Sequence, residues 1–198
     1  QTPWTRKDGL QERFSKVKAP AFISGGWFDG FKQENLLSFR LMKEIAATDK
    51  ARRFTRLLIG PWVHGGLINK EEFGTENDQT EMLKLQDNFI LNGLKDPEND
   101  PLPGVPTVRF FMLGENRWCN TMDWPPANRE KKLYLKENGV LKDLQEEKKE
   151  SLSSYTYDPA DPTPSFNGAR NSLGYYDRRE TEKRSDMLLF NSGTLASP

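Results

Sequence analysis

Two short apolar runs that end in glycine place the strongest constraint on how this chain can fold. Residues 21–24 (AFIS) stop at a Gly-Gly pair, and residues 56–59 (RLLI) stop at a Gly-Pro pair. Apolar runs of this length between turn residues are typical of strands buried in a parallel sheet. We therefore expect two parallel strands, each followed by a sharp turn.

A helical pattern follows each run, over residues 33–47 and residues 80–92. The first apolar face is formed by Leu37, Leu41 and Ile45, and the second by Met82, Leu85 and Phe89. Gly93 is the expected stop of the second helix. Strand, helix, strand and helix in this order predict a parallel sheet with crossover helices.

A proline-rich stretch divides the chain in two. Residues 96–106 (DPENDPLPGVP) hold four prolines and cannot continue a helix. We interpret them as a linker between an α/β domain over residues 1–95 and a β domain over residues 107–198. The predicted fold class is therefore α/β plus all-β.

Short strands and turns are expected throughout the second half. Asn138-Gly139 lies between two apolar runs, and such a pair is the strongest short signal for a β-hairpin. The other strand candidates are residues 108–113, 155–157 and 187–190. Short strands of this kind suggest a sandwich or jelly roll, and the last of them lies close to Pro198, which leaves open whether the β domain is complete.

Composition excludes several functions. Lysine plus arginine and aspartate plus glutamate both number 29, so no net field draws the chain toward nucleic acid or an anionic membrane. The single cysteine, Cys119, excludes an internal disulfide and a cysteine-rich metal site. The first residue is Gln1 and no signal-peptide pattern follows it, so we expect a piece of a longer protein and leave its compartment open.

Asp29 and His64 are the candidate catalytic residues. Asp29 follows the first predicted strand in GGWFDGF, and His64, the only histidine, follows the second in GPWVHGG. Open α/β sheets build their sites at the carboxyl ends of the strands. A carboxylate there can accept the Nδ1 proton of an imidazole and fix its tautomer, and acid before histidine is the α/β-hydrolase order.

These segments resemble those of a known enzyme family. KVKAPAFISGGWFDGF and LLIGPWVHGG are similar to the Asp and His segments of the cocaine-esterase family, which is related to X-prolyl dipeptidyl peptidases and includes α-amino-acid ester hydrolases and glutaryl-cephalosporin acylases. VRFFMLGENRWCNTMDWPP, KKLYLKENGVL, YTYDPADPTPSFNG and RSDMLLFNSGTL resemble its C-terminal jelly-roll domain. The resemblance runs from about Lys16 onward.

The resemblance implies the C-terminal part of a serine hydrolase of esters or amides. Asp29 would be the acid and His64 the base of a Ser-His-Asp triad, and the serine, in a Gly-x-Ser-x-Gly motif that this chain lacks, would lie upstream. Phe31 matches a position that lines the acyl pocket. Trp27 and Trp62 are further candidates for substrate binding, with core packing as the alternative. No metal or cofactor is implied.

The positions after Asp29 narrow the expected substrate. α-Amino-acid ester hydrolases carry acidic residues there, where this chain has Phe31 and Lys32. A neutral or anionic acyl group is therefore favoured, on a small ester, amide or short peptide. The family also suggests a homo-oligomer by analogy. Two alternatives stay open, a carbohydrate- or protein-binding β module without catalysis and a degenerate hydrolase that has lost its serine.

Overall fold

The computed structural model describes residues 12–66, 68–74, 77–127, 130–143, 152–164 and 178–194. The described residues form two compact units, one that runs to Pro126 and one that begins at Ala127. Within the described part of the chain, no helix is both long and apolar enough to cross a membrane.

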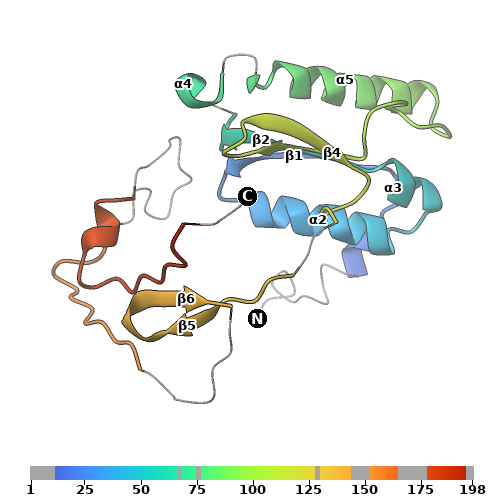
Figure 1. The fold of residues 1–198 in the computed structure, drawn as a ribbon. Helices are drawn as coiled ribbons and strands as arrows, with labels where there is room; N and C mark the ends of the chain where they lie inside the picture. Colours follow the sequence, from blue (N-terminus) through green and yellow to red (C-terminus); the bar gives the residue numbers. More distant parts are fainter. Residues whose placement is uncertain are drawn as a thin grey trace. The chain divides into compact units, whose positions relative to one another are not determined.

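A four-stranded sheet forms the centre of the first unit (Figure 1). Its strands are β1 (Phe22–Phe28), β2 (Arg56–Val63), β3 (Val108–Met112) and β4 (Arg117–Thr121), which lie side by side in that order. The pairs β1–β2 and β2–β3 are parallel, and β3–β4 is antiparallel. The predicted parallel pair is confirmed, and every residue of β2 is buried, as is typical of a central strand with helices on both faces.

Helices cover both faces of this sheet. They are α2 (Lys32–Ile45), α3 (Asp49–Phe54), α4 (Lys70–Phe73) and α5 (Thr80–Lys95). Figure 1 shows α5 on one face, with α2 and α3 on the other. Alternate residues of β2 point to the two faces, so that Leu57 packs in a cluster with Phe39 of α2 and Leu58 in a cluster with Met82 of α5. The sheet therefore has one core on each side.

The buried face of α2 includes the predicted Leu41 but not the predicted Leu37. Leu37 is 44% exposed, whereas Phe39, Leu41 and Met42 are buried. The large Phe39 ring packs with Leu57 and Ile59 of β2, so contact with the sheet selects a neighbouring row of the helix. On α5 the predicted face is confirmed, because Met82 and Leu85 pack in the cluster around Trp62, and the Phe89 ring lies 5.7 Å from that of Phe22.

The helix α5 continues past Gly93, so the predicted stop there is wrong. The turn after the helix brings Pro101 close, and a Cβ at position 93 would lie 3.8 Å from the Pro101 Cβ. Asn92 also donates a side-chain hydrogen bond to the Pro101 carbonyl, at 2.9 Å. The end of α5 thus packs against the proline-rich stretch where the helix continues through Gly93. A glycine inside a helix costs about 1 kcal/mol of stability relative to alanine.

The proline-rich stretch lies within the first unit, whereas the sequence suggested a domain boundary there. Leu102 is buried, and the buried Arg56 guanidinium at the start of β2 donates to both carboxylate oxygens of Asp100, at 2.6 and 2.7 Å. After this stretch, β3 pairs with β2 and continues the same sheet. Residues 107–126 therefore belong with the α/β unit and not with a separate β domain.

The described part of the second unit contains one two-stranded antiparallel sheet. Its strands β5 (Tyr134–Lys136) and β6 (Val140–Lys142) are joined by the 3₁₀ turn η2 (Glu137–Gly139), and a second 3₁₀ turn, η3, spans Thr181–Lys183. Asn138 and Gly139 have φ of 62° and 69°, as a tight hairpin requires, so the predicted hairpin is confirmed.

Two other predicted strands in this unit are wrong. Residues 155–157 and 187–190 have no strand structure, although the adjacent Asn191 forms an isolated bridge with Val140. The expected jelly roll is not confirmed by the described residues. The charged run over residues 145–150, for which the sequence suggests a solvated loop, lies outside them.

The Arg56–Asp100 pair provides a test of how the proline-rich stretch is held. Removing one partner of a buried ion pair costs about 3–5 kcal/mol, and because the Asp100 side chain is 30% exposed we expect Asp100→Asn to cost about 2 kcal/mol. Chemical denaturation followed by tryptophan fluorescence measures this loss in the first unit alone, because all five tryptophans precede residue 127.

Glu98→Gln is the matched control for Asp100→Asn. Glu98 lies in the same stretch and pairs with Lys50 of α3, but its side chain is 82% exposed. The loss of unfolding free energy should therefore stay below about 0.5 kcal/mol. Equal losses for both variants would contradict a stretch anchored through Arg56.

In the second unit, the Arg184 guanidinium holds two carboxylates. It donates to Asp186 at 2.7 and 2.8 Å and to the Asp161 carboxylate at 3.2 and 3.3 Å. The hydrogen bonds from Arg184, and then that from the Thr163 hydroxyl, lower the pKa of Asp186 from 3.8 to about 2. The ionised form is therefore stabilised in the folded unit.

A pKa lowered by folding makes stability depend on acidity in a defined window. The stabilisation is fully present above pH 3.8 and is lost as the pH falls toward about 2. Carboxyl-carbon NMR of Asp186 during an acid titration should show a midpoint near 2, and Asp186→Asn should remove this part of the acid sensitivity. A midpoint at the ordinary value for aspartate would contradict the contact with Arg184.

Candidate active site

Asp29 and His64 each follow the last residue of a strand. Asp29 comes directly after β1, and His64 directly after β2. Because β1 and β2 are parallel neighbours, their carboxyl ends lie at the same edge of the sheet. The prediction that these two loops share one edge is confirmed.

An irregularity in the strand pairing adjusts which residues meet at this edge. Gly26 pairs with Gly60, but Phe28 pairs with Val63, so β2 carries one extra residue between these pairs. Pro61 lies in the extra stretch, and a bulge is a position where a central strand tolerates proline. A bulge of one residue changes which side chain faces which partner, and here it brings His64 opposite Asp29.

The Asp29 carboxylate and the His64 imidazole are in contact. The imidazole Nδ1 lies 3.1 Å from Oδ2 and 3.3 Å from Oδ1 of Asp29. The Phe31 backbone N–H also donates to Oδ1, at 2.8 Å. Since a carboxylate only accepts, Nδ1 carries a proton in this contact, and in the neutral ring Nε2 then has the lone pair that can accept one.

Burial differs between the two partners. The Asp29 side chain is 12% exposed, whereas that of His64 is 44% exposed. The carboxylate is thus held inside the loop while part of the imidazole faces outward. This arrangement allows the imidazole to exchange a proton with a third group and keeps the acid in a fixed place.

Phe31 lies beside the imidazole. Its ring centroid is 5.4 Å from that of His64, in an edge-to-face arrangement, and 48% of the residue is exposed. Phe31 is also the residue that precedes α2, and its backbone N–H is the donor to Asp29. Phe31 thus lies next to His64, and its role in lining a substrate pocket stays a prediction.

Trp62 lies in the core, and the partly buried Trp27 packs against it. Trp62 is 2% exposed and donates its indole N–H to the Asn77 carbonyl, at 2.8 Å. Trp27 packs against the cluster around Phe39 and donates to the Phe111 carbonyl, at 2.6 Å. These contacts support the packing alternative for both residues and leave Phe31 as the aromatic candidate for substrate contact.

Asn77 contacts Trp62 of β2, and Gln79 contacts Gly66 after His64. Neither residue was predicted from the sequence. Asn77 is buried and accepts from Trp62, and the Gln79 side chain lies against Gly66. Neither residue belongs to a motif or follows a predicted strand, so no local signal distinguishes them from ordinary residues before a helix.

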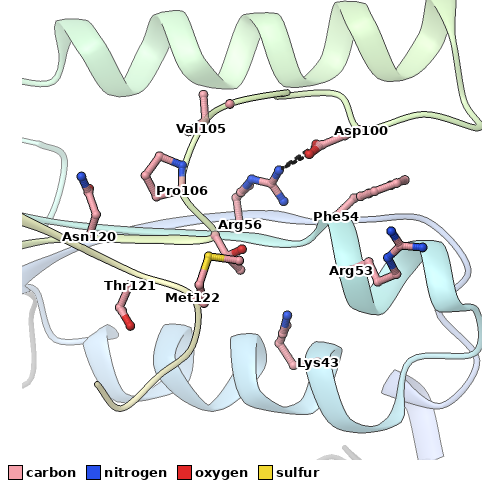
Figure 2. Close-up of a pocket in the computed structure, with 12 residues that line it drawn as sticks. Lys43, Arg53, Phe54, Arg56, Asp100, Val105, Pro106, Asn120, Thr121 and Met122 are labelled. Carbon is pink, nitrogen blue, oxygen red and sulfur yellow. Dashed lines mark hydrogen bonds and ion pairs between the residues drawn. The ribbon is translucent and has the colours of Figure 1, made fainter. Parts of the chain in front are cut away.

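A cavity of about 690 Å³ lies at the opposite edge of the sheet, where β2 and β3 begin (Figure 2). Lys43, Arg53 and Arg56 contribute positive charge to its lining. Arg56 is already paired with Asp100, as the dashed line in Figure 2 shows. This cavity does not include Asp29 or His64, and its buried charge is accounted for by the fold.

Metal binding finds no support in the described residues. Among them, no three histidine, cysteine, aspartate or glutamate side chains are grouped so that they could hold a metal ion. The Asp29–His64 contact is a pair between two side chains and does not form part of such a group.

An acid–histidine pair at the carboxyl edge of a parallel sheet, flanked by helices on both faces, is consistent with the α/β-hydrolase class. A sequence model of the X-Pro dipeptidyl-peptidase (S15) family matches residues 1–66. The chain is also 32% identical to cocaine esterase from Rhodococcus sp. (strain MB1 Bresler), over 96% of this chain and 35% of that protein. The resemblance to the cocaine-esterase and X-prolyl dipeptidyl peptidase family is thereby confirmed.

A solved structure shares the fold. It is an aminopeptidase from the marine sediment archaeon Thaumarchaeota archaeon, with a TM-score of 0.69 and 23% identity over 94% of this chain and 33% of that one. This likeness concerns the fold alone. The chain spans about a third of the length of cocaine esterase, 35%.

The single histidine allows the Asp29–His64 contact to be tested directly. With ¹⁵N-labelled histidine the chain gives one imidazole spectrum, and we expect the Nδ1–H tautomer to dominate in the neutral ring because the carboxylate accepts from Nδ1. Asp29→Asn should shift the ring toward the Nε2–H tautomer, since the amide can donate to Nδ1.

Asp49→Asn is the control, because the Asp49 side chain is 74% exposed and forms ion pairs with Arg52 and Arg53 of its own helix, α3. Its spectrum should match the wild type. The same tautomer in wild type and Asp29→Asn would contradict the hydrogen bond.

Proposed function

We propose that this chain supplies the acid and the base of a Ser-His-Asp triad in a serine hydrolase of ester or amide bonds. The observation that carries the proposal is the 3.1 Å contact between Asp29 and His64 at the carboxyl edge of the sheet. The serine would come from a part of the protein outside these 198 residues, because none of the serines here lies in a Gly-x-Ser-x-Gly motif.

The proposed reaction uses the imidazole twice. The serine oxygen attacks the substrate carbonyl while its proton passes to Nε2 of His64, and the resulting imidazolium donates that proton to the leaving alcohol or amine. Water then attacks the acyl-enzyme and loses a proton to Nε2, and the imidazolium returns that proton to the serine oxygen as the bond between serine and acyl group breaks and the acid product is released. Asp29 remains ionised and stabilises the imidazolium through Nδ1.

The substrate class follows from the residues next to the pair. Phe31 presents an exposed aromatic surface beside His64, which favours an apolar acyl or leaving group. Lys32 follows it, where a carboxylate would be needed to bind a free ammonium group. We therefore propose a neutral or anionic acyl group on a small ester, amide or short peptide, and the names of the relatives, an esterase and peptidases, support this range.

The full-length protein provides the decisive assay. His64→Ala should lower kcat for a p-nitrophenyl ester by about 10⁴- to 10⁶-fold, and Asp29→Asn by about 10⁴-fold, because the triad acts as a unit. Lys84→Ala, at an exposed position of α5, is the control and should retain the wild-type rate.

Two results would overturn the proposal. Wild-type rates for the full-length His64→Ala protein would remove His64 from catalysis. An esterase rate from the 198-residue chain alone that is abolished by His64→Ala would show that the nucleophile lies within this chain. Retention of glycan binding in a variant without both Asp29 and His64, with no hydrolysis by the wild type, would instead support the binding-module alternative.

A further inference from the structure

The orientation of His64 depends on the backbone turn that carries it. The imidazole is 44% exposed, and the contacts described for its ring are with Asp29 and Phe31. Gly66 N–H donates to the Val63 carbonyl at 3.0 Å and closes a turn over residues 63–66, which we name the His64 turn. Whatever holds this turn therefore determines where Nε2 points.

The first end of the His64 turn is held through Trp62. This side chain is buried, and its indole N–H donates to the Asn77 backbone carbonyl at 2.8 Å. Trp62 also bridges to Ile68, so the chain runs back beside it after the turn. Movement at this end would break a buried hydrogen bond, which costs about 1–3 kcal/mol.

Asn77 is itself fixed by its side chain. Its amide oxygen accepts from the Trp118 indole on β4, at 2.8 Å, and its amide nitrogen donates to the Phe73 carbonyl of α4. Asn77 is buried, so these polar groups would be costly to leave unpaired. The carbonyl that receives the Trp62 hydrogen bond is thus tied to β4 and α4.

The other end of the His64 turn lies against Gln79. A Cβ at Gly66 would be 1.7 Å from the Gln79 amide carbon, so the glutamine side chain occupies the space next to this glycine. Gly65 differs in this respect. Its φ of +82° is close to the +83° of Gly66, but a Cβ there would meet no atom within 4 Å.

We propose that residues 77–79, the segment that leads into α5, form a clamp that positions His64 against Asp29. Asn77 holds the strand end through Trp62, and Gln79 covers the exit of the turn at Gly66. Both are positioning residues, since they act through the backbone of the turn. This inference rests on the proposed function, because the orientation of Nε2 matters only if the imidazole transfers a proton.

The clamp predicts a loss in turnover with little change in substrate binding. Gln79→Ala in the full-length protein should lower kcat about 10- to 100-fold, the range for a misplaced catalytic group, while KM changes less than about threefold. Gln79→Met fills a similar space without the polar amide group and should restore at least half of the wild-type kcat. A wild-type kcat for Gln79→Ala would overturn the proposal.

The 198-residue chain gives a second test that needs no activity. Gly65→Ala and Gly66→Ala impose similar backbone strain, but only the second places a methyl group against Gln79. The ¹⁵N spectrum of the single imidazole should therefore lose its Nδ1–H tautomer in Gly66→Ala and Gln79→Ala more than in Gly65→Ala. Equal spectra for the two glycine variants would overturn the clamp.

Failure of the clamp and failure of the triad are distinguishable. If His64→Ala is inactive while Gln79→Ala keeps the wild-type kcat and tautomer, the clamp is wrong and the triad stands. If His64→Ala retains the wild-type rate, the proposed function is wrong, and residues 77–79 then have no role in catalysis through His64. A melting temperature for each variant, followed by tryptophan fluorescence, separates local misplacement from loss of the folded first unit.

Discussion

The contact between the backbones of β1 and β2 at Gly26 is the constraint on which the site depends. A Cβ at this position would lie 1.9 Å from the Trp62 carbonyl oxygen, so only glycine allows the strands to approach at the point where β2 bulges. Because Asp29 follows Gly26 by three residues and His64 follows Trp62 by two, this approach brings the carboxylate and the imidazole together. The close approach of β1 and β2 therefore determines the position of the site, and the loops after the strands carry its side chains.

Local patterns in the sequence predicted the parts of the structure that are decided locally. The two apolar runs fixed the places of β1 and β2, and the residues directly after them, Asp29 and His64, had to share an edge once the strands were parallel. Asn138-Gly139 predicted the hairpin because positive φ at both positions is a property of those residue types. In each case the residues of one short segment are sufficient to determine its local structure.

The structural features that the sequence did not predict depend on contacts between residues far apart along the chain. The buried face of α2 is chosen by the fit of Phe39 to the sheet, and residues 96–106 are ordered by Arg56, some forty residues away along the chain. Residues 155–157 alternate like a strand but have no strand structure in the described part of the chain. Asn77 has no sequence signature, since its importance comes from three partners on separate elements.

The two contacts of the Asp29 carboxylate, with the Phe31 amide and the His64 imidazole, have an electrostatic consequence. Its carboxylate receives one hydrogen bond from the Phe31 amide at the start of α2 and faces the imidazole with its other oxygen. In the proposed reaction, an acceptor that is already oriented need not rotate when positive charge develops on the ring, so the reorganisation that water would require is completed when the protein folds. In the proposed reaction the buried carboxylate would act through its fixed direction, and the partly exposed imidazole would be the member of the pair that changes its protonation state.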